Sequence, residues 1–140
     1  MPTYKTTTTW KGGHLGELSC GNGMKTSFSA PAELHGHHDM LTPEDAFVGA
    51  LNMCFQLMFL WSVERLELEL VSYRCDAKGL VEELLDRTSV FRKVVLHPRI
   101  EARNCGEDAV RRALRLAEKY SLIAASVKTE VVVEPEILVV

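Results

Sequence analysis

The residues of this sequence whose types could do chemistry are first of all its four thiols. They are Cys20, Cys54, Cys75 and Cys105. A thiolate can attack a peroxide or a disulfide, and it can also ligate a metal ion. The sequence has no Cys-x-x-Cys pair and no histidine at zinc-finger spacing, so it does not favour a structural zinc site. In a reducing compartment each cysteine is by default a free thiol, and a redox role must therefore come from the surroundings of one of them.

Cys54 lies near the middle of the long apolar stretch "TPEDAFVGALNMCFQLMFLWSVERL", which runs from Thr42 to Leu66. Two interpretations of this position are open. A free cysteine is among the most buried residue types and can serve only as a small core side chain. Alternatively, a helix positions Cys54 as a nucleophile. The second interpretation requires a nearby cation or hydrogen-bond donor, because burial in apolar surroundings raises the pKa of a thiol.

A histidine-rich segment, "PAELHGHHDML", precedes this stretch and contains His35, His37 and His38 beside Asp39. Imidazole and carboxylate groups are zinc ligands. No other ligand group stands close to them in the sequence, so we interpret the histidines as solvated loop residues and predict no metal site.

The composition narrows the classes of function. The 140 residues, 46% of them hydrophobic, suffice for one domain over residues 1–140. A net charge of -3 with scattered Lys and Arg predicts no nucleic-acid partner. The N-terminus resembles no secretory signal, which predicts a cytoplasmic protein. About sixteen continuous apolar residues, 46–61, fall short of the roughly 20 that cross a bilayer, so we predict a buried helix and no membrane association.

The elements that must position these residues alternate between strands and helices. Thr- and Ser-rich segments separated by glycine turns predict an antiparallel meander of three strands in the first thirty residues, followed by a loop from Pro31 to Leu41. Thr42 is placed to cap a helix, with Pro43 in its first turn. Two β-branched segments follow, 66–79 and 89–104, which we expect to be long strands separated at Gly79 and by a charged segment that can itself be a strand.

A second helix is predicted from Gly106 to Tyr120. Its expected buried face has the helical period, and its charged side chains, Glu118 among them, are expected to face water. The buried face consists of Val110, Ala113, Leu114 and Ala117. Strands in the last fifteen residues complete the order β-β-β-α-β-β-α-β, which is an α+β fold.

The long central helix is apolar on all its faces. A helix of this kind must be covered on every side, and one sheet covers only one side. We therefore expect a second copy of the chain to supply the rest, giving an intertwined homodimer in which antiparallel sheets wrap around the long central helices.

The segment "TPEDAFVGALNMCF" resembles the OsmC/Ohr family, named for osmotically inducible and organic hydroperoxide resistance proteins. In that family a Pro-Glu pair opens the central helix, and the reactive cysteine, followed by Phe, comes ten residues after the Glu, as Cys54 follows Glu44 here. The resemblance continues through "VSYRCDAKG" and "RALRLAEKYSLIAASVKTEV". It implies an OsmC-like fold, a thiol peroxidase without metal or other cofactor, an organic hydroperoxide as substrate, and an external thiol or dithiol as reductant. The histidine loop would then lie near the mouth of the site, where its side chains could contact substrate.

Two departures from the family pattern concern the residues that should serve Cys54. The family's second, resolving cysteine corresponds to Ser121, which cannot form a disulfide. The family's activating arginine should lie in the N-terminal sheet, but no Arg precedes Arg65, and Lys11 or His14 could substitute. Three outcomes are open: a one-cysteine peroxidase resolved by an external thiol, a cycle resolved by another cysteine of the chain, and a family member without peroxidase chemistry. In the last case the protein would bind a small apolar or thiol-reactive ligand at the dimer cleft.

Glu44 is the candidate partner that orients the activating cation. Ten residues of helix separate it from Cys54 by roughly 15 Å along the axis and about 80° around it. Contact therefore requires either a break in the helix after its first turn or a Glu44 supplied by a second chain. We favour the second chain.

Overall fold

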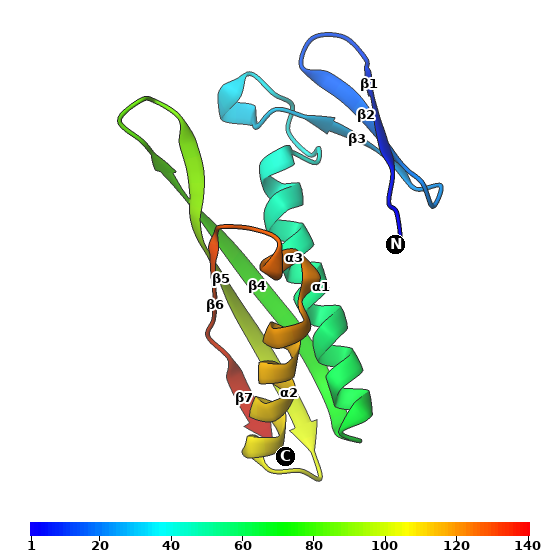
Figure 1. Cartoon of the computed structure of the whole chain (residues 1–140), viewed down its shortest axis with the longest axis vertical. Helices are drawn as coiled ribbons and strands as arrows, with labels where there is room; N and C mark the ends of the chain where they lie inside the picture. Colours follow the sequence, from blue (N-terminus) through cyan, green and yellow to red (C-terminus); the bar gives the residue numbers. More distant parts are fainter. The chain divides into compact units, whose positions relative to one another are not determined.

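The computed structural model describes residues 1–140, which form two compact units, Met1–Phe47 and Val48–Val140. The elements follow one another as three strands, a long helix, two long strands, a second helix and two short strands (Figure 1). The α+β class predicted from the sequence is confirmed.

The N-terminal unit contains the predicted meander. Strands β1 (Thr6–Trp10), β2 (Leu15–Cys20) and β3 (Lys25–Ser29) form an antiparallel sheet in the order β1-β2-β3. The β1–β2 turn needs its glycines, because Gly12 and Gly13 have φ of 102° and 53°, which side chains disfavour. One difference is a short 3-10 helix, η1 (Ala32–Leu34), within the segment predicted to be loop. A single turn of this kind has no hydrophobic period from which it could be predicted.

Helix α1 (Pro43–Arg65) begins where the sequence predicts. The Thr42 hydroxyl accepts a hydrogen bond from the Asp45 backbone N–H at 3.0 Å and donates one to the Asp45 carboxylate at 3.0 Å. This reciprocal cap satisfies a backbone donor that the helix itself leaves free. The helix is continuous over its 23 residues.

The C-terminal unit is built on strands β4 (Glu69–Glu83) and β5 (Ser89–Arg103), which pair antiparallel. The prediction that Gly79 separates strands is wrong, because β4 continues through it. A Cβ at this position would lie 2.7 Å from the Val48 side chain and 2.8 Å from the Phe91 ring. Gly79 therefore allows close packing between α1 and the sheet.

Strands β6 (Glu130–Val133) and β7 (Glu136–Val139) pair with successive parts of β5, and both pairings are parallel. The sequence predicted antiparallel sheets, but this sheet is mixed, because β4 pairs antiparallel with β5 whereas β6 and β7 pair parallel with it. Helices α2 (Glu107–Tyr120) and α3 (Leu122–Ala125) connect β5 to β6. Parallel neighbours need such a crossover connection, so the parallel pairing follows from the position of α2 in the chain.

The core of the C-terminal unit lies between its helices and one face of the sheet. Leu51, Phe55 and Phe59 of α1 are almost fully buried, as are Val94 and Leu96 of β5. The α2 residues predicted from the helical period to be buried are all buried in the structure. Burying one large aliphatic or aromatic side chain stabilises a fold by about 1.5–3 kcal/mol, so this cluster holds α1 and α2 against the sheet.

Candidate functional site

Cys54 points away from strand β4. Asn52, two residues before Cys54, does face β4: its Nδ2 donates a hydrogen bond to the Cys75 carbonyl oxygen at 3.1 Å. Two residues of α-helix turn the chain by about 200°. The Cys54 thiol, which is half-buried, therefore lies on the other side of α1 from Cys75.

The side of α1 that carries Cys54 faces the C-terminal end of α2. Trp61, seven residues after Cys54 and so on the same side of the helix, packs edge-on against Tyr120 with 6.0 Å between ring centroids. Tyr120 ends α2, and Ser121 follows it. The segment in which the family's second cysteine is expected therefore lies on the Cys54 side of α1. Within its own unit the Cys54 thiol makes no hydrogen bond or ion pair.

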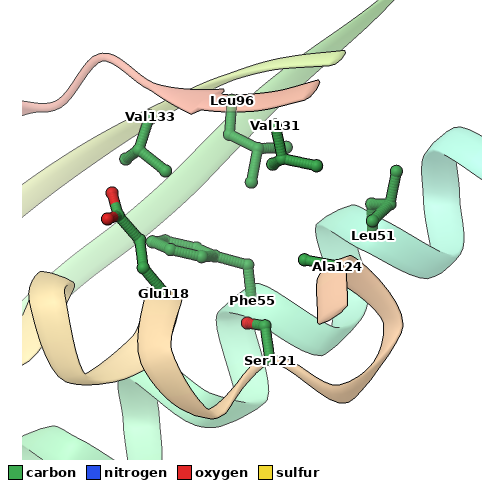
Figure 2. Close-up of a pocket in the computed structure, with 8 residues that line it drawn as sticks. All are labelled: Leu51, Phe55, Leu96, Glu118, Ser121, Ala124, Val131 and Val133. Atoms are coloured by element: carbon green, nitrogen blue, oxygen red, sulfur yellow. The ribbon is translucent and has the colours of Figure 1, made fainter. Parts of the chain in front are cut away.

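A pocket of about 90 Å³ lies next to this side of α1, between α1, the end of α2, and strands β5 and β6 (Figure 2). Leu51 and Phe55 of α1 point into it, as do Glu118 and Ser121. Leu51 is three residues before Cys54 and Phe55 is its direct neighbour, so the thiol borders the pocket wall without lining it. Glu118 is exposed to water, as its place on the charged side of α2 predicts, but it also lines this pocket, which the sequence did not reveal. Its position three residues before Ser121, on the same helix face, is a signal that could have identified it.

Ser121 has a structural role in this fold. Its side chain is buried, with 3% of the residue exposed, and its hydroxyl donates a hydrogen bond to the Ala117 carbonyl oxygen at 2.6 Å. Ala117 O lies in the last turn of α2, where carbonyl groups lack partners within the helix. Ser121 therefore stabilises the helix end and supplies no redox chemistry.

Cys75 and Cys105 are poorly placed to react with Cys54 of the same chain. Burial raises the pKa of the Cys75 thiol above its ordinary range, which keeps it protonated at neutral pH. Cys105 precedes α2 whereas Ser121 follows it, so the length of the helix, about 20 Å, separates Cys105 from the pocket. Cys20 belongs to the N-terminal unit.

Tyr73 is the other buried titratable group near Cys75. Its ring stacks on Phe59, with centroids 5.3 Å apart, and its hydroxyl is buried with only the Cys75 thiol beside it as a weak partner. Burial raises its pKa above the ordinary value, and the Cys75 thiol beside it adds to the effect. The folded state therefore disfavours the phenolate.

We expect Tyr73→Phe to change the stability at pH 7 by no more than about 1 kcal/mol, because the only partner of the buried hydroxyl is the Cys75 thiol, which is a weak hydrogen-bonding group. The unfolded phenol titrates near pH 10, while the folded one stays protonated. The wild type therefore loses stability as pH rises through about 10, and the variant should lose less. Urea unfolding at pH 7 and pH 10.5 measures both effects, and a large loss of stability in Tyr73→Phe at pH 7 would contradict this account.

Glu44 lies in the first turn of α1 with one carboxylate oxygen, Oε1, buried and without a hydrogen-bond partner. Because α1 is continuous, the alternative in which the helix breaks after its first turn is wrong. Lys11 and His14 lie exposed in the β1–β2 turn, and neither forms an ion pair with Glu44. A donor for Glu44 Oε1 therefore has to come from outside the N-terminal unit.

The histidine loop is ordered by its backbone. The Ser29 hydroxyl accepts a hydrogen bond from the His37 backbone N–H at 3.0 Å, while His35 and Asp39 adopt positive φ of 67° and 62°. The histidines themselves are exposed. No three His, Cys, Asp or Glu side chains are grouped so that they could hold a metal ion.

One face of α1 carries large apolar side chains that the C-terminal unit leaves largely exposed. Met53, Leu57 and Trp61 recur every four residues and are 64%, 59% and 42% exposed. We call these three residues the α1 stripe. The whole of α1 is long and apolar enough to cross a membrane by length and composition alone. The sixteen continuous apolar residues counted in the sequence had predicted no such span. The opposite face of α1 is packed in the core, so the stripe is an uncovered surface of a folded unit.

The chain is similar to one protein family and to several solved structures. The family of OsmC-like proteins matches residues 36–136. An OsmC-like protein of unknown function from Vibrio cholerae is 25% identical, with a TM-score of 0.88 over 96% of this chain and 99% of that one. An organic hydroperoxide resistance protein from Elizabethkingia anophelis is 18% identical, with a TM-score of 0.76 over 98% of this chain and 96% of that one. An organic hydroperoxide resistance protein of Bacillus subtilis is 15% identical, with a TM-score of 0.65 over 97% of this chain and 98% of that one. No curated protein matches.

Proposed function

Because the chain belongs to the OsmC-like protein family, we propose that it reduces organic hydroperoxides through the thiol of Cys54. The observation that carries this proposal is the position of Cys54 on α1. The thiol is half-buried, faces the end of α2, and lies between an apolar pocket and the exposed α1 stripe. An apolar surround of this kind favours the organic part of a hydroperoxide over hydrogen peroxide.

The proposed reaction consumes one hydroperoxide and two equivalents of external thiol. The Cys54 thiolate attacks the peroxide, an S–O bond forms, the O–O bond breaks, and the alkoxide leaves and takes up a proton to become an alcohol. Cys54 is then a sulfenic acid. An external thiol displaces water from it to form a mixed disulfide, and a second thiol releases Cys54 as the external disulfide leaves. No metal or prosthetic group takes part.

The positions of the other cysteines support resolution by an external thiol. Ser121 occupies the segment in which the family has its second cysteine. Cys75 lies across α1 from Cys54, and Cys105 lies at the far end of α2. A dithiol reductant would serve as well as two separate thiols.

We further propose that a second copy of the chain completes the site in a cytoplasmic homodimer that needs neither nucleic acid nor a membrane. Glu44 Oε1 lacks a donor within its own unit, and a cation held by Glu44 is the simplest way to keep Cys54 of the other chain as a thiolate. Lys11 or His14 is our proposed cation. Both are exposed, so they are free to reach a partner.

The introduction of a second thiol tests this arrangement. We expect the wild type to gain one oxygen atom per chain when titrated with cumene hydroperoxide. Ser121→Cys should instead lose two hydrogens, as a disulfide forms between Cys54 and the thiol introduced at position 121. The substitution is nearly isosteric, and position 121 lies on the Cys54 side of α1. Intact mass before and after a reductant distinguishes the two products.

Cys54→Ser combined with Ser121→Cys is the matched control, since it has the introduced thiol without the nucleophile. It should gain no disulfide within the chain. A wild type that takes up no oxygen at stoichiometric peroxide, and whose thiols do not react with alkylating agents at neutral pH, would contradict the peroxidase proposal.

A second candidate function is non-catalytic binding of a small apolar or thiol-reactive ligand at the same dimer cleft. It is favoured because the Cys54 thiol has no hydrogen-bond or ion-pair partner within its unit, and a thiol without such a partner is a weak nucleophile at neutral pH. Steady consumption of peroxide in the presence of dithiothreitol, rather than a single oxidation per chain, decides for catalysis.

A further inference from the structure

The mainly apolar pocket beside Cys54 has two polar lining residues that peroxide reduction does not use. Six of its lining residues are apolar: Leu51, Phe55, Leu96, Ala124, Val131 and Val133. The two others are Glu118 and Ser121, which both belong to the end of α2. Figure 2 shows the Glu118 carboxylate standing beside Phe55 and Val133, with Ser121 on the same side of the pocket.

Both polar groups offer the pocket only hydrogen-bond acceptors. The Ser121 hydrogen is already donated to the Ala117 carbonyl oxygen at 2.6 Å, which leaves the Oγ lone pairs. The Glu118 carboxylate makes no hydrogen bond and no ion pair with any side chain. Of the four cations on α2, Lys119 lies 5.3 Å from the Tyr120 ring and Arg111 pairs with Glu107, while neither Arg112 nor Arg115 forms an ion pair with Glu118. A ligand that complements this pocket must therefore bring the donors itself.

The position of the pocket adds to its preference for positive charge. Glu118 stands in the last turn of α2, where the helix dipole and the free carbonyl groups already make the potential negative. An acidic side chain is unfavourable there for the helix alone. Glu118 is exposed, but the partial desolvation of its carboxylate raises its pKa above the ordinary value, and a bound cation would reverse this effect.

We propose that this pocket binds a small organic ammonium ion, with its apolar body among the aliphatic side chains and its N–H groups donating to the Glu118 carboxylate and to Ser121 Oγ. The volume of about 90 Å³ sets the size. An apolar cavity of roughly 150 Å³ holds benzene, so this pocket accommodates a chain of about four carbons. The inference goes beyond peroxide reduction, because it requires no reaction at Cys54.

The test uses n-butylammonium chloride as the probe, with 1-butanol as its uncharged counterpart, on the reduced full-length protein at neutral pH. We expect saturable chemical-shift changes at the methyl groups of Leu51, Val131 and Val133, with an affinity for n-butylammonium at least about tenfold above that for 1-butanol, since a charge-assisted hydrogen bond is roughly twice as strong as a neutral one. Ammonium chloride, which lacks the apolar body, should bind far more weakly.

Two variants locate the interaction. Glu118→Gln should remove the preference for the ammonium ion over the alcohol, while Ala124→Leu should fill the pocket and weaken the binding of both. Glu107→Gln is the matched control at the other end of α2 and should bind like the wild type. A melting temperature of Glu118→Gln at or above that of the wild type shows that the fold is intact. Equal affinity for 1-butanol, an unchanged preference in Glu118→Gln, or no saturable binding of n-butylammonium would each overturn the proposal.

Discussion

Cys54→Ser protein is expected to gain no oxygen from cumene hydroperoxide and to consume it more than about 100-fold more slowly than the wild type with the same external dithiol. A hydroxyl at this position is not ionised at neutral pH and cannot form the S–O bond on which the reaction depends. The fold should be unaffected, because a half-buried sulfur is replaced by a smaller polar atom that can reach water. Intact mass and the loss of peroxide over time measure the two effects.

Cys105→Ser is the matched control for this prediction. It removes a thiol of similar exposure that lies a helix length away from the pocket. This variant should keep both the oxygen adduct and the rate of peroxide loss. Equal oxidation of Cys54→Ser and the wild type would assign the chemistry to another thiol and remove the basis of the proposed function.

Leu57→Lys is expected to convert a homodimer into a monomer and to abolish peroxide reduction with it. Leu57 is 59% exposed at the centre of the α1 stripe. In the proposed dimer the introduced ammonium group would be buried at the contact between two α1 helices, where an unpaired charge is strongly unfavourable. Activity should fall together with the dimer, because each Cys54 would lose the Glu44 of the other chain. Sedimentation should give twice the 15.7 kDa chain mass for the wild type and one chain mass for the variant.

Leu138→Lys provides the control, because Leu138 is 57% exposed in the same unit but lies on β7 rather than on α1. It should remain dimeric and active. A monomeric wild type at micromolar concentration, or a dimeric Leu57→Lys, would show that a second copy does not cover the stripe. Flotation of the wild type with lipid vesicles would instead indicate that the α1 stripe binds a membrane. We favour the second copy, since the other face of α1 is already packed in the core.

The parts of this protein that the sequence predicted correctly are those governed by residues close together in the chain. Thr42 and Asp45 lie three residues apart and form the expected cap. Val110 and Ala117 are buried because the helical period places them on one face. The sequence also predicted correctly that Cys54 lies within the long helix that follows Thr42.

Contacts between distant segments set the features that the sequence missed. Gly79 reads locally as a strand end, but the approach of Val48 and Phe91 makes it a packing position within β4. The sequence does not distinguish Cys75 from any other strand cysteine, whereas in the structure burial raises the pKa of its thiol. Glu118 is exposed, as the charged side of the α2 pattern predicts, but only the fold shows that it lines a pocket together with residues of α3 and β6.

By itself, then, the sequence determined the helix that carries Cys54, the α+β order of elements and the family, because capping, periodicity and the Glu44 to Cys54 spacing are local properties of the chain. Only the tertiary structure decided which side of α1 the thiol occupies, that Ser121 is buried in a hydrogen bond to the helix end, and that an acceptor-only pocket lies beside it. The physical reason is that burial, and with it the pKa and the partners of a polar group, depends on which segments meet in space. Neither the hydrophobic period nor a local motif predicts these contacts between distant segments.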